Sequence, residues 1–219
     1  MTTAEIYDRF QIPRNLRRHM YRVAAVGDAI VRGAEFPEEL NHDAIVATLL
    51  LHDLGNILKF DWKQAEHLFD PDERDMEHWK DVQRQIRSAY GPAVHGATLA
   101  MAQEIGASSM VLDLLKNMGN SQLLNSANGE NWNLKICLYC DARVTPHGFT
   151  TISERIADIL ERYQTRFTPE KVAEMKAVEQ ALLDMEQQFN DRYALSLPEL
   201  SEPALQQRME TLSDFSHFA

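Results

Sequence analysis

Five side chains of the kinds that bind metal ions or move protons lie where the sequence pattern predicts buried helix faces. They are His19, the adjacent pair His52 and Asp53, His95, and Asp141. Removing an imidazole or a carboxylate from water is unfavourable unless the group gains a hydrogen bond, an ion pair or a metal ion. One such residue is most simply a satisfied core histidine or a buried pair. Several on successive helices indicate one shared site inside a bundle.

The chemistry open to these groups is that of a divalent metal ion. Imidazole nitrogen and carboxylate oxygen bind Mn, Fe, Co, Ni, Zn or Mg without selecting sharply among them. A bound ion would offset the burial of its ligands and lower the pKa of a bound water, which makes hydroxide available near neutral pH. The residues alone leave open the alternative that His52 and Asp53 form an ordinary structural pair.

The segment that must position this pair is Asn41–Leu58, NHDAIVATLLLHDLGNIL. Asn41 or Asp43 can cap a helix start, and we interpret His42-Asp43 as part of that start. The apolar run from Ala44 to Leu51 is typical of a helix covered on nearly all sides. The sequence therefore predicts that the pair emerges at the end of a buried helix.

The other candidate residues lie on further predicted helices. His19 shares an apolar face within a helix from about Pro13 to Arg32, and His95 begins a helix that runs to Gly106, facing its apolar side. Asp141 lies on the apolar stripe of a helix over Asn133–Val144. Carboxylates rarely lie unpaired on such a stripe, so Asp141 is expected to have a partner.

The remaining pattern predicts short helices in 61–91, loops and a helical C-terminal part. The loops are Gly33–Leu40, Gly119–Trp132 and a linker at Leu195–Pro203, and the later helices are Ile152–Tyr163, Pro169–Arg192 and Pro203–Phe215. No strand-like alternation persists, so we predict an all-α fold. We divide it into a helical domain over 1–160 and a helical extension over 161–219 packed on the same domain. The extension either completes the core or forms a homodimer interface.

Composition excludes several classes of protein. The chain has 219 residues, 44% of them hydrophobic, and a formal net charge of −11. That charge disfavours nucleic-acid binding, although an anionic small molecule can bind in a locally basic pocket. No apolar stretch is long enough for a membrane span, and no signal peptide is recognised, so we expect a cytoplasmic protein. Cys137 and Cys140 lack the second pair that zinc needs, and we interpret them as small core residues.

The candidate residues resemble the pattern of the HD-domain metal-dependent phosphohydrolases. That family has one His, then an adjacent His-Asp at the end of an apolar helix, then a distant Asp. The matching residues are His19, His52-Asp53 in LLLHDLGN, and Asp141 in YCDARVTPHG. The resemblance covers roughly Phe10 to Ile159, and the DARVTPHG stretch makes it more specific than a bare His-Asp pair.

The resemblance implies a helical bundle that holds one or two divalent ions and hydrolyses phosphate esters, commonly nucleotides. By it, His19, His52, Asp53 and Asp141 would be metal ligands. Asp53 would also orient the attacking water or bridge two metal ions, and His95 would be a proton donor, a phosphate contact or a weak second-site ligand.

The sequence also departs from the family pattern. Many members have Lys where this chain has Asn56, so Lys59 is the candidate to reach substrate instead. The further His of two-metal members is missing, which favours one metal ion. Arg143 either contacts phosphate or pairs with an acid.

The function predicted from the sequence is therefore a divalent-metal-dependent phosphohydrolase. Its substrate would be a nucleotide or another small phosphate ester, contacted by Asn56, Lys59 and Arg143, with Asp53 and His95 as catalytic groups. The alternative is a regulatory module of the same fold that binds a nucleotide or a metal without turnover. The absent lysine at Asn56 and the appended C-terminal helices motivate that alternative.

Overall fold

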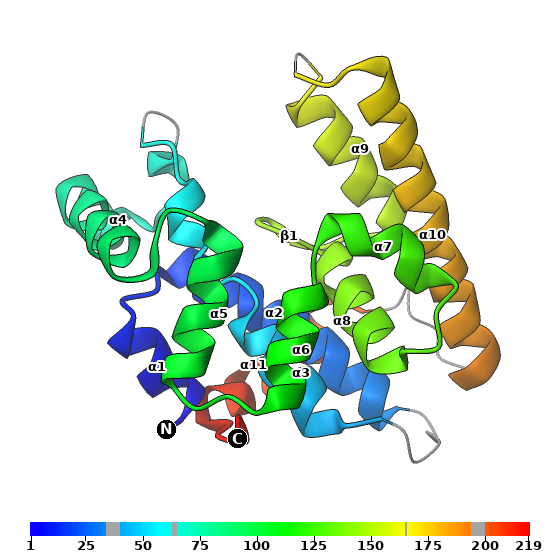
Figure 1. The fold of residues 1–219 in the computed structure, drawn as a ribbon, viewed down its shortest axis with the longest axis horizontal. Helices are drawn as coiled ribbons and strands as arrows, with labels where there is room; N and C mark the ends of the chain where they lie inside the picture. Colours follow the sequence, from blue (N-terminus) through cyan, green and yellow to red (C-terminus); the bar gives the residue numbers. More distant parts are fainter. Residues whose placement is uncertain (34–39, 63–64, 165, 194–199) are drawn as a thin grey trace.

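The structure is a computed structural model that describes residues 1–33, 40–62, 65–164, 166–193 and 200–219. Within these residues the chain is all-α, apart from one β-hairpin whose two strands have two residues each (Figure 1). The helices are α1 (Thr3–Arg9), α2 (Arg14–Arg32), α3 (His42–Leu51), α4 (Met76–Tyr90), α5 (Val94–Glu104), α6 (Ser109–Asn117), α7 (Asn120–Ala127), α8 (Trp132–Ala142), α9 (Ile152–Arg162), α10 (Pro169–Tyr193) and α11 (Glu202–Thr211). Short 3-10 turns are η1 (Asn56–Lys59), η2 (Glu66–Leu68), η3 (Pro71–Glu73) and η5 (Leu212–Asp214). Strands β1 (Val144–Thr145) and β2 (Gly148–Phe149) pair antiparallel.

Two helices at the centre of the fold are covered on nearly all sides. In α3, every residue from Ala44 to Leu51 is buried, and in α8 every residue from Asn133 to Cys140 is buried. Each large aliphatic side chain among them stabilises the fold by about 2 kcal/mol on burial. The prediction of a covered helix before His52 is therefore confirmed, and the two cysteines are buried free thiols inside α8, as expected.

Helix α2 crosses both central helices, and glycine permits the close contact with α3. A Cβ atom at Gly27 would lie 2.3 Å from Leu49 Cδ1, so no larger residue fits without a shift. The α3 helix begins at Asn41, whose side-chain oxygen accepts a 2.9 Å hydrogen bond from the Ala44 N–H. These contacts fix the register in which α2 meets the C-terminal end of α3.

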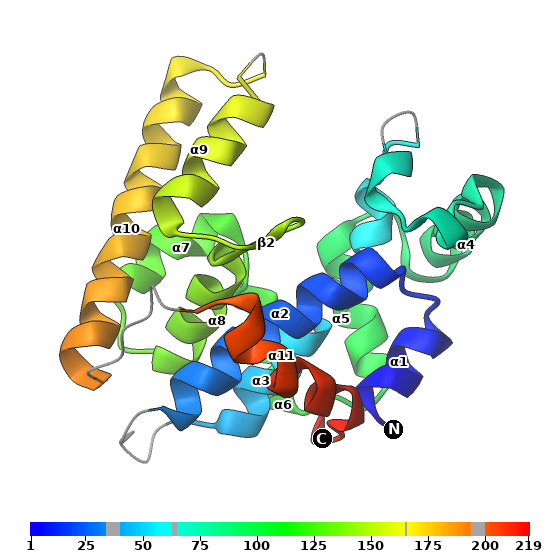
Figure 2. The same cartoon turned by 180° about the vertical axis from the view of Figure 1, so that it is seen from behind.

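The outer helices surround this centre. Helices α9 and α10 form an antiparallel pair that extends well beyond the body, and α4 lies on the opposite side of the molecule (Figures 1 and 2). The chain ends lie close together, and the Thr3 N–H donates to the Phe215 carbonyl at 2.9 Å. Among the described residues, none of the helices combines the length and apolarity required to cross a bilayer.

Several local predictions need correction. The composition of the Asn- and Ser-rich stretch from Gly119 to Trp132 predicts a loop, but the stretch contains α7. Leu123 and Ala127 pack into the core, and this tertiary burial outweighs weak helix propensity. Helix α1 was missed despite its Thr2–Glu5 capping box. Most of the predicted loop Gly33–Leu40, and part of the linker Leu195–Pro203, lie outside the described residues.

A buried carboxylate joins three parts of the chain behind the central helices. Asp28 on α2 has a side chain that is only 10% exposed. It accepts hydrogen bonds from Arg32 Nε at 2.7 Å, from His42 Nε2 at 2.8 Å and from the Arg208 guanidinium of α11. Burial opposes ionisation, but these donors hold the pKa of Asp28 well below its ordinary value. The C-terminal segment is thus bound to α2 through an ion-pair network.

We predict that His42 contributes to stability in a pH-dependent way. Its hydrogen bond to Asp28 raises its pKa above the ordinary 6.5, against the opposing effect of burial. A raised folded-state pKa gives stabilisation that is full below pH 6.5 and is lost as the pH rises through the folded-state value. His42→Gln should therefore lower the free energy of unfolding more at pH 6 than at pH 9 in urea denaturation.

The matched control is His147→Gln, which removes an exposed histidine from the hairpin. It should change stability little at either pH. An equal loss at pH 6 and pH 9 in His42→Gln would contradict the assigned role of the Asp28 pair.

Candidate metal centre

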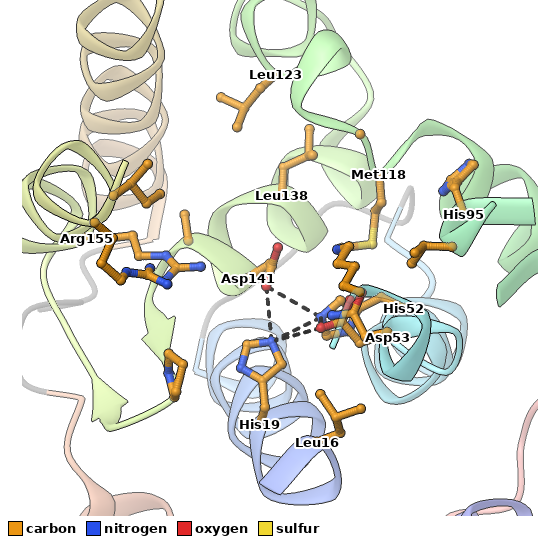
Figure 3. Close-up of a pocket in the computed structure, with 18 of the residues that line it drawn as sticks. Leu16, His19, His52, Asp53, His95, Met118, Leu123, Leu138, Asp141 and Arg155 are labelled. Atoms are coloured by element: carbon orange, nitrogen blue, oxygen red, sulfur yellow. Dashed lines mark hydrogen bonds and ion pairs between the residues drawn. The ribbon is translucent and has the colours of Figure 1, made fainter. Parts of the chain in front are cut away.

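Three helices bring the predicted ligands together. His19 projects from the second turn of α2, His52 and Asp53 follow the last residue of α3, and Asp141 lies in the last turn of α8. Figure 3 shows the four side chains meeting at one point. The C-terminal ends of α3 and α8 therefore hold polar groups, while the middle residues of both helices are buried in the hydrophobic core.

The distances within the cluster are those of groups that share one small space. His19 Nε2 lies 3.3 Å from both His52 Nε2 and Asp141 Oδ1, and His52 Nε2 lies 3.4 Å from Asp141 Oδ1. One ligand atom from each of these three residues lies within 4.8 Å of the others. Two imidazole nitrogens and one carboxylate oxygen form a set that can hold a metal ion.

The α3 end orients His52. Its Nδ1 lies 2.7 Å from the Leu49 carbonyl oxygen, and a carbonyl oxygen only accepts, so Nδ1 carries the proton. In the neutral ring, Nε2 then presents its lone pair to His19 and Asp141. A histidine ligand whose other nitrogen donates to a backbone carbonyl is the usual way in which proteins fix the metal-binding tautomer.

The electrostatics of the cluster favour positive charge at its centre. Burial lowers the pKa of His52, but the charge of Asp53 and the hydrogen bond and charge of Asp141 outweigh it and raise the pKa to about 9. For Asp141, desolvation raises the pKa, but hydrogen bonds with His19 and His52 hold it well below the ordinary 3.8. The two carboxylates therefore create a field that suits a cation.

Asp53 lies next to this set without being one of its three members. Its Oδ2 is 3.5 Å from His19 Nε2 and 3.8 Å from His52 Nε2, and its side chain is 18% exposed. Asp141 is more open, with 43% of its side chain exposed. Asp53 can thus contact an ion or its water from the α3 side.

The residues present fit a divalent metal ion. His19 and His52 supply nitrogen, Asp141 supplies oxygen, and Asp53 supplies a neighbouring carboxylate. The hydrogen bond from His52 Nδ1 to the Leu49 carbonyl is the kind of supporting contact that orients a metal-binding histidine. The structure is therefore compatible with the predicted set of ligands.

A large cleft opens at this cluster. Its volume is about 1180 Å³, and residues of α2, α5 to α10 and the turn after α3 line it. Among the described residues, seven Lys or Arg side chains line it against three carboxylates, which is the reverse of the charge balance of the whole chain. The cations are Arg18, Arg22, Lys59, Lys116, Arg155, Arg162 and Lys171.

Four of these cations have an acidic partner within 3.0 Å. Arg18 pairs with Asp70, Arg22 with Glu202, Arg162 with Asp158 and Lys171 with Glu174. Within the described part of the chain, neither Lys59 nor Lys116 forms an ion pair, and the nearest acid to Arg155 Nη1 is Asp158 at 3.7 Å. Lys59, Lys116 and Arg155 are therefore the cations with most charge to offer an anion.

Of the other predicted site residues, three line the cleft, whereas Arg143 is not among the lining residues. Asn56, Lys59 and His95 line the cleft with the candidate ligands, and Asn56 Oδ1 is buried with no hydrogen-bond partner among the described residues. His95 is exposed on α5, whereas the sequence pattern placed it on a buried face, and it is not one of the three grouped ligands. Its position is compatible with a contact to substrate from across the cleft.

Arg143 is not among the residues that line the cleft. Of its two predicted roles, phosphate contact or pairing with an acid, the structure shows the pairing with an acid. The side chain is 2% exposed, donates from Nε to the Thr150 carbonyl at 2.6 Å and places Nη1 3.3 Å from Glu186 Oε2. It also donates to the Tyr139 hydroxyl. Arg143 thus ties α8 to α10, and the predicted contact of Arg143 with substrate does not fit this geometry.

Arg155 is a candidate that the sequence did not reveal. It extends from α9 toward Asp141 (Figure 3), and its buried Nη1 has no hydrogen bond among the described residues. The capping box of Thr151 and Glu154 and the buried Ile152 and Ile156 give α9 its start and its inner face. They do not show that this helix packs over the cleft, so no local signal identified Arg155.

Comparison with protein-family models, curated proteins and solved structures gives no match to this chain.

Gly55 holds the turn of His52 and Asp53 against α5. Its N–H donates to Thr98 Oγ1 at 3.0 Å, and a Cβ at this position would lie 2.5 Å from the Val94 carbonyl oxygen. Backbone atoms cannot give way as a flexible side chain can. The glycine therefore permits the close approach that places the ligand turn beside α5.

We predict that Gly55→Ala displaces this turn. The overlap with Val94 should lower the free energy of unfolding by about 1–3 kcal/mol, the range for overpacked sites, and should weaken divalent-metal binding. Thermal unfolding and calorimetric titration with Mn²⁺ measure the two effects. The control is Gly96→Ala on α5, where the nearest atom to a new Cβ is Ala93 Cβ at 3.7 Å. It should keep metal affinity, and unchanged affinity in both variants would contradict the prediction.

Proposed function

We propose that this protein is a divalent-metal-dependent phosphohydrolase of the HD-domain type, acting on a nucleotide or another small phosphate ester. The observation that carries the proposal is the grouping of His19, His52 and Asp141 within 4.8 Å at the floor of a cleft lined by an excess of cations. The resemblance of LLLHDLGN and YCDARVTPHG to that family supports the same reading.

The residues divide into three roles. His19, His52 and Asp141 would hold the ion, which when bound supplies Lewis acidity and a water of lowered pKa. Asp53, whose Oδ2 lies 3.5 Å from His19 Nε2, would accept a hydrogen bond from the attacking water and orient it. Lys59, Lys116 and Arg155 would bind the phosphoryl oxygens, and His95 would protonate or contact the leaving group from α5.

The first test compares metal content and turnover. We expect the untagged protein to contain about one equivalent of a divalent metal ion and to release phosphate from nucleoside monophosphates or p-nitrophenyl phosphate with one of Mn, Co, Ni, Zn or Mg. His52→Gln should lose both by more than about 100-fold, since even residues behind a ligand are worth 10–100-fold. His67→Gln is the control, because His67 lines the same cleft but is exposed and outside the ligand group.

Failure of metal binding in the wild type, after incubation with each of these ions, would contradict the proposed centre. Metal and nucleotide binding without phosphate release would instead favour the non-catalytic module. Thermal stabilisation by nucleotide, measured on the same samples, separates these two outcomes.

A second test separates the two carboxylates. Asp141 belongs to the grouped ligand atoms and Asp53 lies beside them, so Asp141→Asn should reduce metal affinity more than Asp53→Asn. Asp53→Asn should keep most of the bound metal at saturating concentration and lower kcat by about 100-fold or more, the usual range for a general acid or base. The reverse order of metal affinities would show that Asp53 is the stronger ligand.

A further inference from the structure

The cleft continues past the metal centre into an arm with mainly aliphatic walls. Asp141 and Leu138 lie three residues apart on one face of α8, and Figure 3 shows Leu138 next to Asp141 with Leu123 of α7 beyond it. The opposite wall belongs to the α9–α10 pair. We call this region the apolar arm; its lining residues are Leu123, Leu138, Ile156, Ile159, Met175, Val178 and Leu182.

A cation lies where the apolar arm meets the metal centre. Arg155 and Ile159 are four residues apart on α9, so they lie on the same face of that helix. Both line the cleft, and the buried Nη1 of Arg155 has no hydrogen bond among the described residues. The combination offers an anion site at one end and an apolar surface at the other.

The size of the cleft exceeds what a phosphate group alone requires. A volume of about 1180 Å³ is above the 300–1,000 Å³ typical of pockets for drug-sized ligands. The lining of the apolar arm also provides little for reading a nucleobase. Among the described lining residues between α7 and α10, the uncharged side chains that can hydrogen-bond are Gln122, His147 and Tyr163, and none of them belongs to the aliphatic set that defines the apolar arm. A nucleobase buried there would leave polar groups unpaired, which is unfavourable.

We infer that the substrate is a phosphate ester of a bulky apolar group, with the phosphate at the metal centre and Arg155 and the alkyl or aryl group in the apolar arm. The hydrolysis step of this inference rests on the proposed function, whereas the binding mode does not depend on it. Hydrolysis would join the water oxygen to phosphorus and break the bond from phosphorus to the ester oxygen. The departing oxygen would take a proton, giving phosphate and an apolar alcohol.

Binding of non-hydrolysable alkylphosphonates tests the inference without turnover. We would titrate the full chain with propyl-, pentyl-, hexyl- and octylphosphonate below their aggregation concentrations, with the active metal where one is found and otherwise without metal. Each buried methylene should tighten binding by about fourfold, since it contributes about 0.8 kcal/mol. Octylphosphonate should also bind tighter than adenosine monophosphate.

Two variants separate the ends of the site. Ile159→Gln should flatten the dependence on chain length while keeping the affinity for propylphosphonate. Arg155→Gln should weaken all four ligands by a similar factor and leave the slope unchanged. The matched controls are Leu160→Gln, which changes the neighbouring half-buried residue outside the cleft lining, and Arg162→Gln. The Arg162 guanidinium donates two hydrogen bonds to Asp158, whereas Arg155 Nη1 lies 3.7 Å from that carboxylate and forms none among the described residues.

Ile159→Trp gives a second test should the glutamine variant unfold, because it keeps an apolar side chain but fills the arm. It should exclude octylphosphonate and retain propylphosphonate. A flat dependence on chain length in the wild type, or tighter binding of adenosine monophosphate than of octylphosphonate, would overturn the inference. Chain-length-dependent binding without hydrolysis of octyl phosphate under any metal would support the apolar arm and reject the phosphohydrolase.

Discussion

The structure depends on how two fully buried helices end. The interiors of α3 and α8 are apolar, so these helices must lie at the centre of the fold, yet each ends in ionisable groups that need partners. Both needs are met because the two C-terminal ends reach the same cleft. There His52 and Asp141 come within 3.4 Å, and His19 of α2 completes the group. The hydrophobic core and the candidate metal centre are therefore consequences of one arrangement.

Local charge in the cleft differs from the charge of the chain. A formal net charge of −11 would repel a phosphate approaching most of the surface. Inside the cleft the acids are Asp53, Asp141 and Glu174, and the cations outnumber them among the described residues. Because several of these cations are already paired, the attraction is concentrated on Lys59, Lys116 and Arg155.

The α9–α10 pair is the element that gives this cleft its depth. Helix α10 is held to α8 by Arg143, which bridges Thr150, Tyr139 and Glu186. That buried network ties α8 and the residue before the α9 N-cap to α10, and residues of all three helices line the cleft. The C-terminal helices are thus part of the candidate site: α10 lines it, and α11 anchors α2 through Asp28 and Arg208.

The sequence by itself determined most of the helices and the principal candidate ligands, because these follow from local signals. The apolar run before His52 required a covered helix, and His19 and Asp141 interrupted apolar faces that could not leave them unpaired. Only the tertiary structure decided which groups meet. It exposed His95 to the cleft, drew Arg143 into an ion pair, folded α7 from a loop-like composition and brought Arg155 toward Asp141. Those outcomes depend on contacts between residues far apart in the chain, which periodicity and spacing do not encode.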